Sequence, residues 1–557
     1  MNSVPSQPVL KCPEAKTWET RLLGDEAAEW AAMQRAGEAV ARVILEDFRE
    51  IGGLSAKARL LVLAGKGHNG GDALLAAKTI LEKFPQTTAD VLLCFGEAAL
   101  RPLARRSLDD LRHVASPRVY VTGTHPGALR HPSLEGIFAR ADSGSPLERG
   151  ARQGGVCWDL CLDGIFGFQF RAPMDADTAA LIATVNAHAG IMLRAAVDLP
   201  SGVGETNATT IFQADFTYAT GIVKRPVLSP DVAASVGRLR YLDLGFFDNV
   251  AGLGEPGSSF AKASDDGPGS PTPATERILI RQILAPLGKL RASQSDKRTF
   301  GHLLVVGGSH SYPGAVVLAV RAALRSGAGL VTAFVPERLA PDYAARHPEA
   351  MWVGCPETPK GGLALGALDL IQERMPRATA LLMGPGLSAE PEVLATVEAI
   401  ARHTNLPLVL DADALRPEVI AACQGKRVIC TPHAGEYERL GGRAGLRPAS
   451  GDSATGEIVA VLKGPLTRVI VASDRSETGP TYYSPFGGPV LARGGSGDIP
   501  AGLTGGLLAQ KPDDLLLAAC RGVVWHGRAA DLLARARGQV AVEISEILEQ
   551  LGPALLP

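Results

Sequence analysis

The sequence contains no apolar run that approaches the ~20 residues needed to span a membrane as a helix. Its first residues, 1–13, have neither the basic start nor the apolar core of a secretory signal peptide. The formal net charge of the 557 residues is only -2, so the chain lacks the basic surplus that binds nucleic acid. We therefore expect a cytoplasmic protein whose partners are small molecules, with no membrane or nucleic-acid partner.

The chain also has few cysteines and none of them forms a C-x-x-C pair. Most of the eight lie in apolar, strand-like runs, which is typical of reduced, buried thiols in a cytoplasmic protein. Cys157 and Cys161 are four residues apart on one expected strand, and we interpret them as buried residues and not as metal ligands.

The length and composition indicate more than one globular domain. A chain of 557 residues is too long for a single hydrophobic core, and its 46% hydrophobic and 20% charged residues are ordinary for globular domains. Residues 249–274 are rich in Gly, Ser, Pro and Asp and have no periodicity, which indicates a linker. We predict a first domain over 1–247, a linker over 248–280 and a second domain over 281–557, with a surface loop at 143–155.

Apolar strands alternate with helices in the first half, and this order predicts a parallel α/β sheet. We expect helices over 25–51 and 72–84. Strands are expected over 60–64, 90–95, 118–121, 191–197 and 238–243, with another inside 156–167. Asp163, Asp198 and Ser201 each follow a strand, and ligands of open parallel sheets bind beyond the carboxyl ends of the strands. We therefore expect these three side chains to gather at one edge of the sheet.

The second half shows a fresh α/β alternation without repeating the sequence of the first. Its expected strands cover 302–306, 329–335, 378–383, 407–410, 427–430 and 467–472, and its expected helices cover 313–326, 502–509 or slightly earlier, and most of 512–536.

Two glycine-rich loops, each between an apolar strand and a helix, suggest two nucleotide-type sites. The loop in Ala492–Leu507 places four glycines and Asp498 near the start of a helix. Glycines let backbone N–H groups approach a ligand, and a helix N-terminus favours an anion. A carboxylate there could equally be a plain helix cap. The second such loop is Gly65–Asp72.

Other polar residues follow expected strands in the second half. Lys463 and Thr467 suit a nucleotide phosphate, although Lys-Gly before a strand is usually an exposed turn. His433 fits a surface histidine at a helix start equally well, and Asp411 and Asp413 could be helix caps. Only their combination with the Asp498 loop indicates a functional site.

Further short runs complete a pattern that covers most of the chain. In the second half they are Gly307–Ser309, Tyr312–Ala315, Arg325–Leu330, Gly384–Gly386, Asp411–Leu415, Pro432–Glu436, Lys463–Gly464, Gly495–Asp498 and His526–Gly527; in the first half they are Gly67–Asp72, Asp163–Gly167 and Asp198–Gly202. By these runs residues 297–532 resemble the ADP/ATP-dependent NAD(P)H-hydrate dehydratases, and residues 20–245 resemble the NAD(P)H-hydrate epimerase domain. The order of the two is that of the bifunctional bacterial repair enzymes. The resemblance implies an α/β protein with an N-terminal Rossmann-like three-layer αβα domain and a C-terminal ribokinase-like αβα domain.

For the second domain, the resemblance implies that hydrated NADH or NADPH, with water added across the C5=C6 bond of the nicotinamide ring, is dehydrated while ADP becomes AMP and phosphate. Mg²⁺ is expected with the ADP. Asp498 would act as general base on the C6 hydroxyl, and the Gly495–Gly497 amides would stabilise the phosphoryl oxygens. The implied nucleotide-binding residues are Lys463, Gly464, Pro465, Leu466, Thr467 and Gly497, and the implied substrate-binding residues are Ala315, Gly386, His433 and Asp498.

For the first domain, the resemblance implies interconversion of the R and S hydrates at C6, with Asp198 as the catalytic acid–base. The implied substrate-binding residues are His68, Asn69, Gly70, Gly71, Asp72, Gly167, Phe168, Gln169, Phe170, Arg171, Ala172, Pro173 and Asp198. Asn69, Asp163 and Ser201 would coordinate a potassium ion, since all three offer hard oxygen ligands. We also expect a homo-oligomer.

Four positions depart from the family pattern. His68 and Ala73 stand where the epimerase loop usually has Asn and Gly, and His68 adds bulk and a titratable group that bear on the epimerase rate. Ser388 stands where a glycine is common, and Pro500 replaces an aliphatic residue. We expect Pro500 to be neutral because proline is tolerated in a first helical turn.

Two other functions stay open at this point. A ribokinase-like small-molecule kinase would use the same anion loop and aspartate to phosphorylate a hydroxyl. The first domain could instead be a non-catalytic ligand-binding or oligomerisation module, although Asn69, Asp163, Asp198 and Ser201 argue against that. An NAD-linked oxidoreductase is disfavoured because the first glycine loop does not keep the G-x-G-x-x-G spacing.

Overall fold

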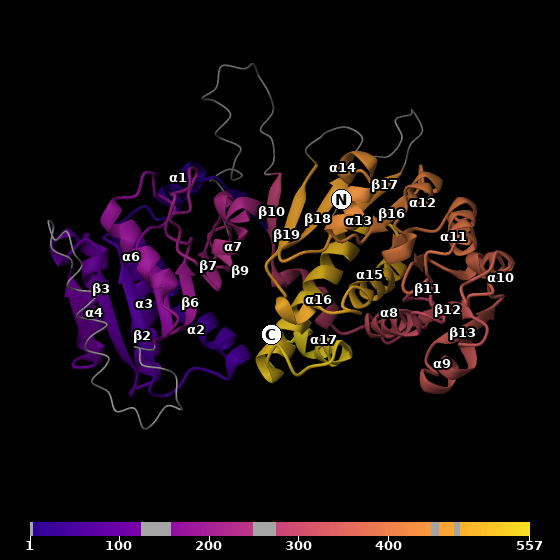
Figure 1. Cartoon of the computed structure of the whole chain (residues 1–557), viewed down its shortest axis with the longest axis horizontal. Helices are drawn as coiled ribbons and strands as arrows, with labels where there is room; N and C mark the ends of the chain where they lie inside the picture. Colours follow the sequence, from indigo (N-terminus) through magenta and orange to yellow (C-terminus); the bar gives the residue numbers. More distant parts are fainter. Residues whose placement is uncertain (1–3, 124–157, 249–274, 447–455, 473–478, 557) are drawn as a thin grey trace, which may run out of the picture. The chain divides into compact units, whose positions relative to one another are not determined.

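The computed structural model describes residues 4–123, 158–248, 275–446, 456–472 and 479–556. Their contacts divide the chain into two compact units, one of residues 7–274 and one of residues 275–557 together with 1–6 (Figure 1). The predicted domain boundaries stay a prediction, and the structural border falls between residues 274 and 275. The predicted linker at 249–274 and the predicted surface loop at 143–155 lie outside the described residues.

The unit of residues 7–274 is built on a parallel seven-stranded sheet with the strand order β4-β3-β2-β5-β6-β7-β9. The strands are β2 (Arg59–Ala64), β3 (Thr88–Leu93), β4 (Val119–Gly123), β5 (Trp158–Gly164), β6 (Ile191–Val197), β7 (Phe216–Thr220) and β9 (Arg238–Leu242). Ala64 of β2 is aligned with Leu93 of β3 and with Gly164 of β5, so the carboxyl ends of neighbouring strands meet at one edge. A short parallel ladder also joins β1 (Ser6–Leu10) to β8 (Val223–Lys224).

Helices cover both faces of this sheet, as a parallel sheet requires. Alternate residues of each strand point to opposite faces: Leu60 and Val62 pack in one core with α2, α3 and α4, and Leu61 and Leu63 pack in another with α6. The helices of the unit are α1 (Cys12–Leu22), α2 (Glu26–Asp47), α3 (His68–Lys83), α4 (Pro102–Ala115), α6 (Ala176–Ala187) and the short α7 (Ala233–Val236). The predicted αβα layering is confirmed.

The unit that begins at residue 275 has a sheet with the strand order β13-β12-β11-β14-β15-β16-β17-β18-β19-β10. These strands are β10 (Glu276–Leu279), β11 (His302–Val306), β12 (Leu330–Pro336), β13 (Met351–Cys355), β14 (Ala380–Met383), β15 (Leu408–Leu410), β16 (Arg427–Cys430), β17 (Glu457–Leu462), β18 (Thr467–Ala472) and β19 (Thr481–Ser484). The pairs β17–β18 and β18–β19 are antiparallel, and the other pairs are parallel.

Two helical layers again enclose the sheet. Leu303 and Val305 of β11 pack with α8, α15, α16 and α17, and Leu304 and Val306 pack with α10, α11 and α12 on the other face. The helices are α8 (Pro313–Arg325), α9 (Ala340–Arg346), α10 (Ala367–Arg374), α11 (Pro391–His403), α12 (Pro417–Ala422), α13 (Ala434–Arg439), α14 (Gly442–Gly445), α15 (Asp498–Gln510), α16 (Leu515–Arg537) and α17 (Ile547–Leu555). Among the described residues of both units, no helix is long and apolar enough to cross a membrane.

Candidate active sites

Asp498 is the first residue of α15, and this helix starts four residues before Gly502, as the sequence allowed. Gly497 occupies the N-cap position, so Asp498 is not the N-terminal cap that the sequence also allowed. Burial, with a smaller contribution from the nearby Asp411 carboxylate, raises the pKa of Asp498 to about 7, even though the Lys463 cation lowers it. The carboxyl group is therefore poised between its two protonation states near neutral pH, which suits a general base.

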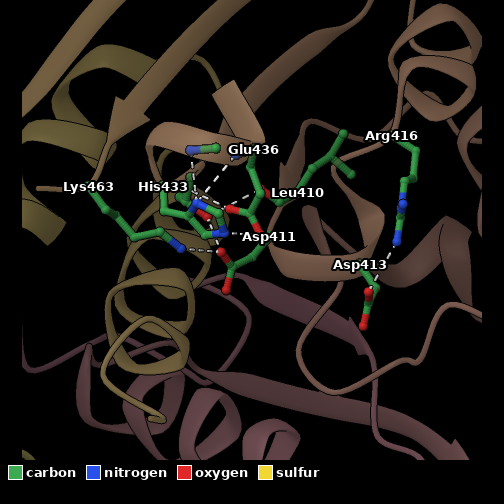
Figure 2. Close-up of polar contacts among 9 residues, drawn as sticks. Leu410, Asp411, Asp413, Arg416, His433, Glu436 and Lys463 are labelled. Carbon is green, nitrogen blue, oxygen red and sulfur yellow. Dashed lines mark hydrogen bonds and ion pairs between the residues drawn. The ribbon is translucent and has the colours of Figure 1, made fainter. Parts of the chain in front are cut away.

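Lys463 is held by Asp411, as Figure 2 shows, and its ammonium group interacts electrostatically with Asp498. Lys463 Nζ lies 2.8 Å from Asp411 Oδ1, and the same oxygen accepts a 2.6 Å hydrogen bond from Thr431 Oγ1. Asp411 is only 1% exposed and its side chain caps no helix. Burial lowers the pKa of Lys463, but the Asp411 carboxylate outweighs this and the net shift is upward. Lys463 therefore stays a fixed cation, and the helix-cap interpretation of Asp411 is wrong.

Asp413 lies apart from this pair, beside Arg416 (Figure 2). Arg416 Nη2 is 3.4 Å from Asp413 Oδ1, and the Ser388 backbone N–H donates a 3.2 Å hydrogen bond to Asp413 Oδ2. Ser388 has a φ of 85°, in the left-handed region. That conformation explains why glycine suits this position, since only glycine adopts it without steric cost.

His433 caps the start of α13. The ring Nδ1 of His433 accepts hydrogen bonds from the backbone N–H groups of Gly435 and Glu436. The backbone N–H of His433 donates to Glu436 Oε2 at 2.9 Å. The geometry is thus that of a helix-start histidine, with 60% of its side chain exposed. Its backbone also forms a parallel bridge with Lys463, which keeps the exposed ring beside the Asp411–Lys463 pair.

The predicted nucleotide-binding run of residues 463–467 forms the turn between the antiparallel strands β17 and β18, with Gly464 and Pro465 exposed. A Cβ atom at Gly497 would lie 3.2 Å from Lys463 Nζ, so the ammonium group rests against the glycine loop. These contacts place the turn of residues 463–467 beside the Gly495–Gly497 loop and Asp498.

The other two predicted substrate residues of this unit contact each other. Gly386 has a φ of 68°, and a Cβ atom there would lie 2.4 Å from the Tyr312 carbonyl oxygen and 3.1 Å from the Ala315 Cβ. Ala315 is in the first turn of α8, and Leu318, one turn further on, would contact a Cβ placed at Gly495. Gly386 and Ala315 therefore lie on the α8 side of the Asp498 loop.

In the unit of residues 7–274, a cavity of 840 Å³ opens at the predicted site. Of the predicted substrate residues, His68, Asn69, Asp72, Gly167, Phe168, Gln169, Phe170, Arg171, Pro173 and Asp198 line it. Gly70, Gly71 and Ala172 do not line it; a Cβ atom at Gly70 would lie 2.2 Å from the Gly65 carbonyl oxygen, so this glycine permits a close backbone approach.

One expectation about this loop is wrong. The sequence predicted a glycine loop up to Asp72 with the helix starting there, whereas α3 starts at His68. Residues 68–72 are thus the first turn of a helix. The N–H groups at this end of α3 still lack intrahelical partners, so the turn keeps its preference for an anion.

Asp163 and Ser201 lie together at the carboxyl ends of β5 and β6, and Asn69 of α3 is connected to them through Phe166. Ser201 Oγ donates a 2.6 Å hydrogen bond to Asp163 Oδ1, and Ser201 N donates to Oδ2 at 2.7 Å. Asn69 Nδ2 donates to the Phe166 carbonyl, and Phe166 N donates to Ser201 Oγ. Burial raises the pKa of Asp163 to about 6, and the Ser201 hydrogen bonds partly offset this.

Asp198 is held in an unusual conformation. Its φ is 67°, in the left-handed region that costs free energy for residues other than glycine and is concentrated at functional sites. Its Oδ1 lies 2.7 Å from Lys224 Nζ and accepts a 3.4 Å hydrogen bond from Thr220 Oγ1. Both groups line the cavity with Asp198.

Lys224 and Glu19 are among the cavity residues that the sequence reasoning missed. Lys224 is 1% exposed and lies 3.5 Å from Glu19 Oε1 as well as 2.7 Å from Asp198. A lysine directly after the apolar Gly221–Val223 was an available signal for a buried, paired cation. Glu19 carried no such signal, because it lies on a mostly polar N-terminal helix.

Comparisons with known proteins match both units. A family model described as NAD(P)H-hydrate dehydratase matches residues 303–552, and a model described as YjeF-related protein N-terminus matches residues 30–226. The chain is 32% identical over 542 residues to the bifunctional NAD(P)H-hydrate repair enzyme Nnr of Moorella thermoacetica, covering 93% of this chain and 91% of the relative. It is 34% identical over 545 residues to the enzyme of that name from Gloeobacter violaceus, covering 95% and 93%.

A solved structure of the ADP/ATP-dependent NAD(P)H-hydrate dehydratase from Bacillus subtilis, co-crystallised with ATP and Mg²⁺, is 26% identical; the match covers 50% of this chain and 96% of that chain with a TM-score of 0.39. The matches to full-length relatives span both units, and they do not favour a kinase fused to an idle module. The chain belongs to the family of bifunctional NAD(P)H-hydrate repair enzymes.

Proposed function

We propose that this chain repairs hydrated NADH and NADPH in two reactions. The unit of residues 7–274 interconverts the R and S epimers at C6. The second unit dehydrates the S epimer and converts ADP to AMP and phosphate. The observation that supports this most directly is Asp498, a carboxyl group with a raised pKa at the start of α15 beside a fixed Lys463 cation.

In the dehydration reaction, Asp498 accepts the proton of the C6 hydroxyl as the hydroxyl oxygen attacks the terminal phosphorus of ADP. Lys463 and the turn at 464–467 hold the nucleotide phosphates, and the Gly495–Gly497 amides stabilise the transferring oxygens. The C6–O bond then breaks with phosphate as leaving group, and C5 loses a proton to solvent, which restores the C5=C6 double bond. Mg²⁺ would be bound mainly through the ADP phosphates, and it would supply neutralising charge to them.

In the epimerase unit, Asp198 acts as the catalytic acid–base for inversion at C6, and the first turn of α3 with residues 167–173 positions the dinucleotide. Asn69, Asp163 and Ser201 are proposed as the potassium ligands. Their fit is supported by the fixed amide of Asn69, whose Nδ2 is engaged by the Phe166 carbonyl and whose oxygen remains as an acceptor, and by the buried Asp163 carboxylate. A bound potassium ion would supply positive charge for a substrate oxygen.

We also propose a cytoplasmic location and a homo-oligomeric state. Support for a reducing compartment comes from the cysteines, because every one within the described ranges is free and buried. Light scattering on the purified protein would measure the oligomeric state.

The test of the two reactions is the recovery of NADH from a mixture of both hydrate epimers, with ADP and Mg²⁺ present and spontaneous epimerisation kept slow. We expect full conversion, with one phosphate released per NADH formed. Conversion that stops near the fraction of S epimer would disprove the epimerase reaction alone. A product that retains the phosphate would instead identify a kinase.

The dehydration rate should rise with pH through about 7, because the active base is ionised Asp498 and its pKa is raised to about 7. Asp411→Asn removes a negative charge that raises this pKa, so the ascending limb should move to lower pH. The matched control is Asp413→Asn, since Asp413 pairs with Arg416 and not with Lys463. A pH profile of kcat/KM on pure S epimer checks this, and an unmoved limb in Asp411→Asn would contradict it.

A further inference from the structure

Two carboxyl groups share one buried lysine in the epimerase unit. Lys224 Nζ lies 2.7 Å from Asp198 Oδ1 and 3.5 Å from Glu19 Oε1, and it also sits 4.8 Å above the centre of the Phe168 ring. Lys224 lies between the two carboxyl groups because of how the strands pair. Its strand, β8, pairs with β1, and β1 leads directly into α1, the helix that carries Glu19. Three segments far apart in the sequence therefore meet at one ammonium group.

Glu19 and Asp198 both line the 840 Å³ cavity, together with the residues of α3 and the 167–173 segment that bind the dinucleotide in the proposed function. Glu19 keeps 23% of its side chain exposed, whereas Asp198 keeps 6% and Lys224 1%. Glu19 is thus the more accessible of the two carboxyl groups that flank the lysine. The Glu19 carboxyl group can therefore contact a substrate bound in the cavity.

We propose that Glu19 is a second acid–base residue of the epimerase site, and that it works with Asp198 across the Lys224 ammonium group. This inference rests on the proposed epimerase function of the unit. It assigns the two proton transfers of the reaction to two different carboxyl groups.

The chemistry of C6 requires two such transfers. C6 carries a hydroxyl group and is bonded to N1, so its hydroxyl leaves most readily when it is protonated. A neutral Glu19 gives its proton to that oxygen, the C6–O bond breaks, and the N1 lone pair forms a C6=N1 double bond with release of water. Water then adds to the opposite face of C6, the electron pair returns to N1, and the Asp198 carboxylate takes the proton from the added water.

The surroundings of Glu19 allow its carboxyl group to hold a proton near neutral pH. Burial raises the pKa of Glu19 to about 7, Lys224 lowers it, and Asp198 raises it. The charged or titratable groups that face Glu19 are Lys224 of β8, Asp198 after β6, Glu29 of α2 and Asp72 of α3. The nearer ion pair of Lys224 is with Asp198, which leaves Glu19 as the acid and Asp198 as the base. After turnover the roles exchange, and Lys224 stabilises whichever carboxylate is charged.

The test is Glu19→Gln in the full-length protein, with Glu38→Gln as the matched control because Glu38 is an exposed glutamate of α2. Pure R hydrate of NADH is supplied without ADP, and formation of the S hydrate is followed by chromatography with the spontaneous rate subtracted. We expect kcat for epimerisation to fall about 10²-fold or more in Glu19→Gln, with KM little changed. The wild-type rate should decline above pH about 7, where Glu19 loses its proton, and the residual activity of the variant should lose that limb.

Dehydration of pure S hydrate with ADP reports separately that the variant is folded and should equal the wild-type rate. Full epimerase activity in Glu19→Gln, or a lowered rate that keeps the alkaline limb, would overturn the inference. A wild-type chain without any epimerase activity would remove the proposed function and the inference together. Wild-type activity combined with a fully active variant would remove the inference alone.

Discussion

Asp498→Ala should reduce NADH formation from the S hydrate by about 10²–10⁴-fold, the range typical for loss of a general base. Asp498 is the only acidic residue in the Gly495–Pro500 segment at the start of α15, and its pKa of about 7 suits proton abstraction near neutral pH. Nucleotide binding should persist, because the turn at 463–467 and the loop amides provide the phosphate contacts in our proposal. Alanine is also a strong helix former, so α15 should remain intact.

Two measurements separate these effects. NADH absorbance on pure S hydrate gives the dehydration rate, and calorimetric titration with ADP and Mg²⁺ gives the nucleotide affinity. Asp498→Asn keeps the shape of the side chain without the base and should lose as much activity as Asp498→Ala. Asp513→Ala is a suitable control because its carboxylate lies on the surface of the same unit, with a side chain 94% exposed. Wild-type turnover in Asp498→Ala would disprove the assignment of Asp498 as the base.

The sequence predicted the strands whose apolar runs end in a clear turn. Residues 191–197 and 302–306 form β6 and β11 over those same residues. It missed β7 (Phe216–Thr220), which has only five residues, three of them Thr or Ala, so no continuous apolar run marks it. It also missed β17 (Glu457–Leu462), because Lys463–Thr467 was interpreted as a loop before one strand and not as a turn joining two antiparallel strands.

The residues of the candidate sites could likewise be predicted only where they are close together in the sequence. The Asp498 loop could be predicted because its glycines and its aspartate are neighbours in the sequence. The pairing of Lys463 with Asp411 spans 52 residues and depends on β15, β16 and β17 being adjacent in the sheet, which no local pattern encodes. Glu19 and Lys224 meet through the β1–β8 ladder, so their role could be inferred only from the structure.

Asp198→Asn should lower the epimerisation rate by about 10²–10⁴-fold while the unit stays folded. Asp198 has a φ of 67°, and asparagine is the residue other than glycine that best tolerates this conformation, so the backbone should be preserved. The buried Lys224 ammonium group keeps Glu19 as a charged partner. Because the Asp198 carboxylate raises the pKa of Glu19, its loss should also move the remaining alkaline limb to lower pH.

Interconversion of the pure R hydrate, followed by chromatography across a pH series, measures both effects. Asp231→Asn is the matched control, since Asp231 is an exposed aspartate of the same unit and should leave rate and profile unchanged. A thermal unfolding curve close to that of the wild type would show that the loss is chemical, because a collapsed site would unfold earlier. Epimerisation at the wild-type rate in Asp198→Asn would mean that the strained aspartate orients Lys224 without exchanging a proton.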